Sequence, residues 1–329
     1  MTKSVRAFAP ASVSNIACGF DILGFALQSE GDGRLGPGDV VTAREREPTA
    51  GAGGHGPVRI TAIAGDEGRL PLEAERNTAA VAAKALVDGE APGVAVDLEI
   101  EKRMPLESGL GSSAASAVAA VVAVDALLGM KLPSAALLRY AVAGEILASG
   151  GPHADNLAPS LLGGLVLVRS LDPEPDVIDL PVPEGLTCAL VRPHAEVNTK
   201  ESRAGLDRHL PLERAVTQWG NAAALVAALY RSDLDLLSRA LVDVVAEPVR
   251  APGVPGFHAA KAAAIEAGAL GCSLSGSGPA LFALCHGRVR ARRVAAAMAG
   301  ALESAVGVNC DQLVAPLPAP GARVINKET

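Results

Sequence analysis

Two glycines and two serines stand directly in front of a long apolar segment, an arrangement that suits phosphate binding. The sequence GLGSS at residues 109–113 opens this segment, and Pro105 stiffens the approach to it. The first amides of a helix have no partner within the helix and carry a partial positive charge, and glycines let a ligand approach the backbone. The stretch therefore predicts a phosphate-binding loop at a helix N-terminus. A tight strand-to-helix turn with a serine cap is the alternative.

Hydroxyl and carboxylate oxygens suited to a divalent cation accompany this loop. Ser112 and Ser113 follow the glycines, and Glu145 lies late in a second apolar segment, residues 134–148. A lone carboxylate on an apolar helix is costly unless it is paired, and Mg²⁺ prefers one or two carboxylates together with phosphate oxygens. Glu145 is therefore a candidate magnesium ligand, with an ordinary surface glutamate as the alternative.

The loop does not match two common nucleotide-binding motifs. It lacks the GK[ST] of P-loop nucleotidases. It also does not match GxGxxG, and no acidic residue closes a following strand about twenty residues further on, as a dinucleotide-binding fold requires.

Three other stretches carry polar groups that could face a ligand. Residues 11–21 follow a predicted strand and contain Asn15 and Asp21. The sequence HADN at 153–156 lies beyond a Gly-Gly-Pro turn, and SLSGSGP at 273–279 forms a glycine turn between two predicted strands. Each stretch alone also fits an ordinary Asx-turn, loop or hairpin.

The elements that must position these groups are predicted from hydrophobic periodicity and turn residues. Strands are predicted at 5–9, 40–44, 58–64, 94–102, 165–168, 187–191, 271–274 and 280–285. Helices are predicted at 77–87, from 112 onward, and at 134–148 with Ser134 as its cap, 211–230, 233–241, 257–267 and 290–304. Residues 48–57 are predicted as an exposed loop and the tail 315–329 as loose.

Composition limits the class of protein. The 329 residues are 49% hydrophobic but only 2% aromatic, so Ala, Val and Leu must fill a sizeable core. The net charge of -7 argues against nucleic-acid and anionic-membrane partners. Five scattered cysteines without a CxxC pair predict reduced thiols, and the first residues show no signal peptide, so we expect a cytoplasmic protein.

Three motifs in order resemble those of the GHMP kinase superfamily. They are APASVSNIACGFD at 9–21, PLESGLGSSAA at 105–115 and SLSGSGPALFAL at 273–284, and the resemblance spans residues 5 to about 286. Within the superfamily the chain is most similar to the homoserine kinases, because GGPHADNLAPSLLGG, the TKESR segment at 199–203 and EPVR at 247–250 resemble motifs of that family. Cys18 departs from the family pattern, where Gly or Pro is commoner, and removes no reactive group.

The resemblance implies an α+β fold of two-layer α/β type. It implies an N-terminal ATP-binding domain like the second domain of ribosomal protein S5, expected at residues 1–170, and a ferredoxin-like C-terminal domain at 171–329. The implied reaction is ATP-dependent phosphorylation of the homoserine hydroxyl, on the route to threonine, by a homodimer.

The resemblance also implies the nucleotide and metal site. The adenine would lie near Asn77 and Thr78, and Mg²⁺ would be held by Glu145 and a hydroxyl of Ser112 or Ser113. The ATP-binding loop would comprise Pro105, Leu106, Glu107, Ser108, Gly109, Leu110, Gly111, Ser112, Ser113 and Ala114.

For the acceptor, the resemblance implies a pocket that matches a zwitterion. Arg203 and Arg250 would bind the carboxylate and Asp21 the ammonium group. Asn15, His153, Asn156, Thr199 and Gly276 complete the expected substrate-binding set. The expected catalytic residues are Asn156, which would orient the hydroxyl, Arg203 and Asp155. Our hypothesis is that no dedicated base exists and that Asp155 mainly shapes the pocket.

Three alternatives stay open from the sequence. The chain could be another GHMP enzyme acting on mevalonate or a sugar, a non-catalytic regulator that binds a nucleotide or metabolite, or a structural α/β protein with coincidental loops. Glu145 together with the serine pair argues against the regulator, because a sensor need not keep a metal site.

Overall fold

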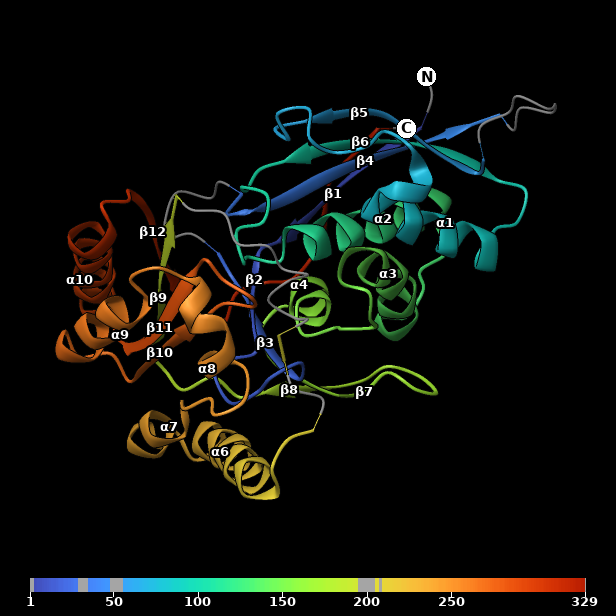
Figure 1. The fold of residues 1–329 in the computed structure, drawn as a ribbon. Helices are drawn as coiled ribbons and strands as arrows, with labels where there is room; N and C mark the ends of the chain where they lie inside the picture. The colour runs from blue at the N-terminus through green and yellow to red at the C-terminus, as the bar shows by residue number, and fades with distance from the viewer. Residues whose placement is uncertain (1–2, 29–34, 48–55, 195–204, 207–208, 329) are drawn as a thin grey trace.

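The computed structural model describes residues 3–28, 35–47, 56–194, 205–206 and 209–328. The predicted site residues Thr199 and Arg203 lie outside this part of the chain. Within it, three sheets and the helices that flank them form the expected α+β architecture (Figure 1). No helix of the described residues is long and apolar enough to cross a membrane.

The first sheet contains both ends of the described chain. Its strand order is β13-β1-β4-β6-β5, and every pair is antiparallel except β5 with β6. The strands are β1 (Ser4–Pro10), β4 (Gly38–Arg46), β5 (Val58–Ala64), β6 (Ala95–Lys102) and β13 (Arg323–Glu328). The predicted alternation in β6 is confirmed, since Val96, Leu98 and Ile100 are buried while Asp97 and Glu99 pair with arginines.

Helices α1 (Thr78–Glu90) and α2 (Ser112–Leu128) pack on one face of this sheet, and α3 (Ser134–Ser149) packs on these two helices (Figure 1). The short 3₁₀ helix η1 (Ala74–Arg76) leads into α1. Helix α2 packs on β1 and β4 and is covered by α1 and α3, so its Ala and Val side chains are buried along nearly its whole length. This burial fixes the position of its N-terminal amides. Helix α3 begins at Ser134 after Pro133 without a side-chain cap, so the predicted serine cap is wrong.

The second sheet is small and links the two halves of the chain. Its order is β2-β3-β7-β8, with antiparallel pairs throughout. The strands are β2 (Ser12–Ser14), β3 (Leu23–Ala26), β7 (Leu165–Ser170) and β8 (Asp176–Leu180). Helix α4 (Leu157–Leu162) packs between this sheet and α2. Strand β8 lies in a proline-rich stretch for which no strand is predicted from the sequence.

The third sheet has the order β10-β11-β9-β12, and its strands are β9 (Leu186–Pro193), β10 (Gly271–Leu274), β11 (Leu281–His286) and β12 (Cys310–Pro316). Side chains alternate between two cores: Ala189 and Val191 pack with α9 and α10, while Cys188 and Leu190 face the other way. The helices of this half are α6 (Leu212–Arg231), α7 (Leu234–Ala240), α8 (Glu247–Arg250), η2 (Ala251–Gly253), α9 (Phe257–Glu266) and α10 (Arg288–Val306).

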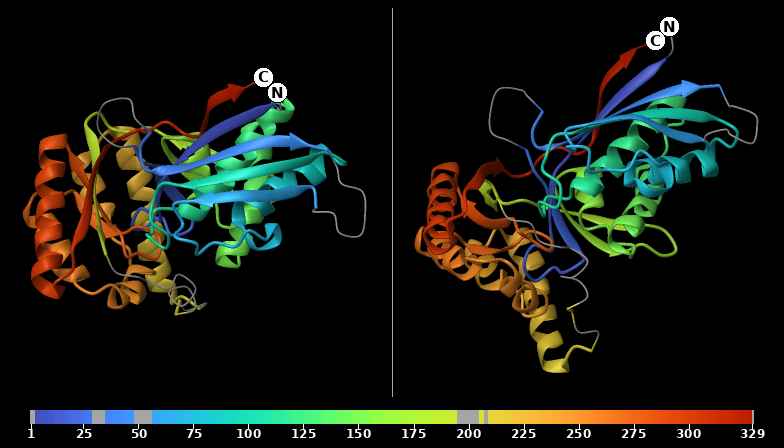
Figure 2. Two further views of the ribbon diagram at one scale, coloured as in Figure 1. Left: turned by 90° about the horizontal axis from the view of Figure 1, so that it is seen from above. Right: turned by 45° about the horizontal axis from the view of Figure 1, so that its top comes forward.

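The expectation of a loose tail is wrong. Strand β12 extends to Pro316, and β13 pairs with β1 in a register that joins Ser4 to Glu328. The two strands run side by side in both views of Figure 2. The physical reason is the free edge of β1, which a strand from the end of the chain can satisfy with backbone hydrogen bonds.

Candidate active site

The predicted phosphate-binding loop lies at the N-terminus of α2. The helix begins at Ser112, and Gly111 occupies the cap position with φ 68°, a left-handed conformation that suits glycine. A Cβ atom on Gly111 would lie 2.4 Å from the Ser12 hydroxyl and 2.8 Å from Asn156 Oδ1. The missing side chain therefore lets the loop approach two polar residues that come from distant parts of the sequence.

Two buried hydroxyls in this loop are available to a ligand. Ser108 is 2% exposed and Ser112 is 9% exposed, and neither hydroxyl has a hydrogen-bond partner in the described part of the chain. A buried hydroxyl without a partner costs free energy. Phosphate oxygens or a hard cation would pair with these groups, so the loop fits the groups expected from the sequence.

A buried ion pair supports the first turn of α2. Lys102 donates to the Asp39 carboxylate, to the Ser112 carbonyl oxygen at 3.0 Å and to Ser116 Oγ at 2.8 Å. The side chains of Lys102 and Asp39 are 2% and 0% exposed. Sequence reasoning missed this pair, although a signal was present: Lys102 continues the inward-facing register of Val96, Leu98 and Ile100.

A cleft of about 970 Å³ opens in front of the loop. It brings together most of the predicted residues: Asn15, Asp21, Asn77, Thr78, Leu106, Glu107, Ser108, Gly109, Gly111, Ser112, Ser113, Glu145, His153, Asp155, Asn156, Arg250 and Gly276. Pro105, Leu110 and Ala114 do not line it: Pro105 is exposed, whereas Leu110 and Ala114 are buried.

Two arginines of the cleft were not predicted. Arg69 and Arg76 line it beside Leu70, Pro71 and Asn77. They precede α1 in a stretch of mixed charge, where nothing distinguishes them from surface arginines. Their position adds positive charge to the end of the cleft that carries the proposed adenine residues.

Next to the glycine loop, hydrogen bonds fix the polar side chains of the cleft. Asn156 accepts from Ser12 Oγ at 2.9 Å and donates to Ser14 Oγ at 3.1 Å. Asn15 donates to the Gly276 carbonyl at 3.1 Å and accepts from the Asp21 amide at 3.0 Å. These bonds join β2, the loop after it, α4 and the glycine turn.

The loop that carries Asn15 and Asp21 is strained. Asn15, Ile16, Ala17 and Asp21 have φ values of 71°, 39°, 55° and 60°. Residues other than glycine rarely adopt this region, and such strain clusters at ligand sites. The same loop buries Cys18, and burial raises the pKa of its thiol to about 12. Cys18 therefore stays protonated at neutral pH and is not a candidate nucleophile.

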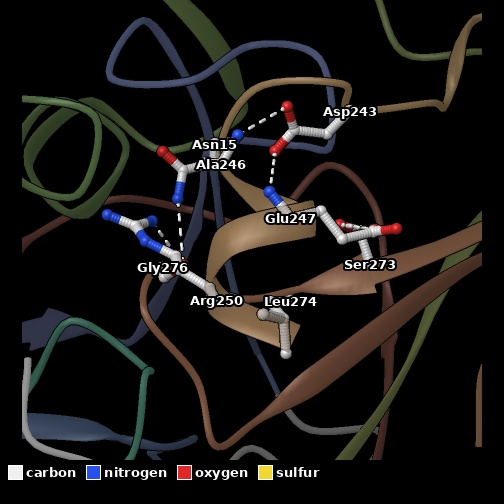
Figure 3. Close-up of a pocket in the computed structure, with 8 residues that line it drawn as sticks. All are labelled: Asn15, Asp243, Ala246, Glu247, Arg250, Ser273, Leu274 and Gly276. Carbon is white, nitrogen blue, oxygen red and sulfur yellow. Dashed lines mark hydrogen bonds between the residues drawn. The ribbon is translucent and has the colours of Figure 1, made fainter. Parts of the chain in front are cut away.

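Arg250 reaches the cleft from α8 and is only 7% exposed. Its Nη1 donates to the Gly276 carbonyl at 2.9 Å, and its guanidinium carbon lies 5.1 Å from the centroid of the Phe20 ring. Figure 3 shows the hydrogen bonds of Arg250 and Asn15 converging on Gly276. Arg250 and the glycine turn are thus held as one unit.

The helix that carries Arg250 is anchored by two carboxylates. Asp243 accepts from the amides of Ala246 at 3.1 Å and Glu247 at 2.8 Å (Figure 3). Glu247 pairs with Lys261 Nζ at 2.5 Å and accepts from Ser273 Oγ at 2.6 Å. These contacts tie α8 to α9 and to β10, so the position of Arg250 is fixed by three elements.

Family models identify the class of protein. The N-terminal domain model of the GHMP kinases matches residues 77–164, and the C-terminal domain model matches residues 225–304. Together the two matches take in the glycine loop, Glu145, Asn156, Arg250 and the glycine turn.

Full-length comparisons narrow the family. The chain is 46% identical to a homoserine kinase of Chlorobium phaeobacteroides, over 98% of this chain and all of that one, and 44% identical to a homoserine kinase of Chlorobaculum tepidum. The crystal structure of a homoserine kinase from Cytophaga hutchinsonii matches with a TM-score of 0.89 and 44% identity, covering 98% of this chain and 97% of that one. The chain therefore belongs to the homoserine kinase family of the GHMP kinases.

Proposed function

We propose that the chain transfers the γ-phosphoryl group of ATP to the hydroxyl of L-homoserine, giving O-phospho-L-homoserine and ADP. The observation that carries the proposal is the cleft itself. A helix N-terminus with two buried hydroxyls lines it, and Asn156, Asp21 and Arg250 line the same cleft, with Asn156 next to Gly111 of the loop. Phosphoryl transfer depends chiefly on positioning and on charge neutralisation, and this arrangement supplies groups for both.

In the nucleotide half, we assign the phosphates to the amides of residues 109–113 and the adenine to the region of Asn77 and Thr78. Asn77 caps α1 by accepting from the Ala79 amide at 3.1 Å, so its position is fixed. Ser112, Ser113 and Glu145 would hold Mg²⁺. When bound, Mg²⁺ neutralises charge on the phosphate oxygens as the terminal bond breaks.

In the acceptor half, the charges match a zwitterion. Arg250 presents a guanidinium for the carboxylate, and the Asp21 carboxylate, with His153 Nδ1 3.4 Å away, suits the ammonium group. Asn156 would orient the hydroxyl, helped by its bonds to Ser12 and Ser14. Arg203 and Thr199, outside the described residues, stay part of the proposed acceptor site.

The proton of the hydroxyl needs no dedicated base in this proposal. Asp155 is 4% exposed and lines the cleft beside Asn156, and we assign it to shaping the pocket, with the proton passing to the transferred phosphoryl group. The test is Asp155→Asn: a loss of about 10⁴-fold in kcat at unchanged KM, the upper range for general-base catalysis, would contradict this assignment.

Two further parts of the proposal concern organisation. We propose domains at residues 1–170 and 171–329, with β13 returning from the second to complete the sheet of the first. We also propose a homodimer, as the family resemblance implies.

The decisive experiment measures ADP release from Mg-ATP with L-homoserine, D-homoserine, L-serine, L-threonine, mevalonate and galactose. We expect rapid turnover of L-homoserine only. Turnover of mevalonate or galactose alone would be consistent with the proposed phosphate site but would contradict the assignment of the acceptor pocket to homoserine. ATP binding without turnover of any compound would favour a regulatory protein.

A further inference from the structure

Helix α6 carries an apolar face that no described part of the chain covers. Leu212, Val216, Trp219 and Tyr230 are 71%, 55%, 63% and 63% exposed. The whole chain has one tryptophan and two tyrosines, so one helix exposes the only Trp and half of the Tyr. In the right-hand view of Figure 2, α6, in yellow, projects from the body of the molecule. Exposed aromatic groups in one patch are typical of a protein–protein interface.

The apolar residues of α6 recur with the spacing of a coiled coil. Steps of four and three residues alternate through Leu212, Val216, Trp219, Ala223, Val226 and Tyr230. The buried face of the helix holds Ala215, Gln218, Leu225, Ala228 and Leu229, and the stripe lies beside it, with Val226 partly packed against the same core. The helix therefore has a second apolar face, on which Leu212, Val216, Trp219 and Tyr230 are exposed among the described residues, while Val226 lies at its edge.

The stripe is complementary to itself when two copies run antiparallel. A two-fold axis near residue 221 places Leu212 opposite the partner's Tyr230, Val216 opposite the partner's Val226, and Trp219 opposite the partner's Ala223. Each large aromatic ring then meets a smaller side chain, as interdigitated packing requires. Most dimers have two-fold symmetry. In such a dimer, each of these contacts occurs twice, once on either side of the axis.

The charged residues of α6 also favour an antiparallel helix pair over a parallel one. Glu213 lies beside the stripe in the first turn and Arg231 in the last turn, where the 70% exposed Arg231 side chain also lies 3.6 Å from the Asp233 carboxylate. An antiparallel pair brings Glu213 of one copy near the partner's Arg231 at both ends. A parallel pair would instead place Glu213 near the partner's Glu213, where like charges repel.

We propose that this face of α6 joins two copies of the chain as an antiparallel helix pair. The inference deepens the homodimer of the proposed function by naming its surface. It does not depend on the reaction, because none of the six stripe residues lines the cleft.

The first test uses the single tryptophan as its own reporter. Wild-type protein is expected at twice its chain mass of 33.2 kDa in light scattering, and its Trp219 emission should shift to longer wavelength as dilution dissociates the dimer. Trp219→Glu should raise the dimer dissociation constant about a hundredfold, as the loss of a buried aromatic anchor does. The matched control is Val289→Glu, which changes an 81% exposed valine on α10 and should leave the dimer intact.

The second test determines whether the two α6 helices run antiparallel or parallel. Cysteine at 212 and cysteine at 230 lie about 27 Å apart along one helix. Leu212→Cys chains mixed with Tyr230→Cys chains should cross-link on mild oxidation, whereas Leu212→Cys alone should not. Cross-linking of Leu212→Cys alone, a monomeric wild type, or an unchanged dimer in Trp219→Glu would each overturn the inference. The ADP-release assay is separate: a monomeric wild type that phosphorylates L-homoserine would reject this surface and keep the proposed reaction.

Discussion

Replacing Gly111 by alanine tests whether the contact of the glycine loop with Asn156 matters for catalysis. Helix α2 provides its own control, because Gly129 at its other end has nearly the same backbone, with φ 70° against 68°. Among the described residues, apart from its own chain neighbours, no atom lies within 4 Å of a Cβ placed on Gly129, whereas one placed on Gly111 would meet Ser12 and Asn156 at 2.4 and 2.8 Å.

Both substitutions should therefore lower the free energy of unfolding through the left-handed backbone, but only Gly111→Ala should also disturb Ser12 and Asn156. Placing alanine in the left-handed region should lower the free energy of unfolding by about 1–2 kcal/mol at either site. Gly111→Ala must also separate Ser12 from Asn156, which share a 2.9 Å hydrogen bond, and losing that bond costs about 1 kcal/mol more. The displaced Asn156 amide should lower kcat about a hundredfold, the effect of a misplacement near 1 Å.

Urea unfolding followed by circular dichroism gives the free energies, and ADP release at saturating L-homoserine gives kcat. Gly129→Ala is expected to lose only stability and to keep wild-type kcat. If both variants lose the same stability and Gly111→Ala turns over at the wild-type rate, the close packing of Ser12, Gly111 and Asn156 has no catalytic role, and the reasoning fails.

Three other predictions follow from the site and the thiols. Glu145→Gln should lower kcat about a hundredfold or more without unfolding the chain, because it removes the carboxylate proposed for Mg²⁺; wild-type turnover would reject that role. Arg250→Lys should raise KM for L-homoserine tenfold or more and leave KM for ATP unchanged, since lysine cannot form the two-pronged contact; equal changes would argue against carboxylate binding. Burial raises the pKa of Cys18 and Cys272 to about 12 from 9.0, so the unfolded chain loses these protons first and the free energy of unfolding should fall as pH rises above about 9. Urea titrations at several alkaline pH values should show a shallower fall for Cys272→Ala.

The helix start behind the glycines was predicted correctly because its signals are local. Glycines at 109 and 111 and the apolar run behind them define a helix start within a few residues, and α2 begins at Ser112. The alternation in β6 is equally local, and the structure confirms it.

Contacts between segments far apart in the chain could not be predicted from local sequence patterns. Asn15 meets the Gly276 carbonyl across 261 positions, and Ser12 meets Asn156 across 144. No periodicity encodes such pairs, so the family resemblance supplied the expected grouping of these residues. The buried pairing of Lys102 with Asp39 was missed because a lysine at the end of a strand is usually exposed.

The pairing of β13 with β1 sets an order of events during synthesis. Strand β1 leaves the ribosome long before its partner at residues 323–328 is made. Until then, β1 has β4 on one side and an open row of backbone amides and carbonyls on the other. The sheet of the N-terminal half therefore cannot be completed until residues 323–328 have been made, and the nascent protein carries an exposed sheet edge until then. A deletion of residues 323–328 would leave that edge exposed permanently.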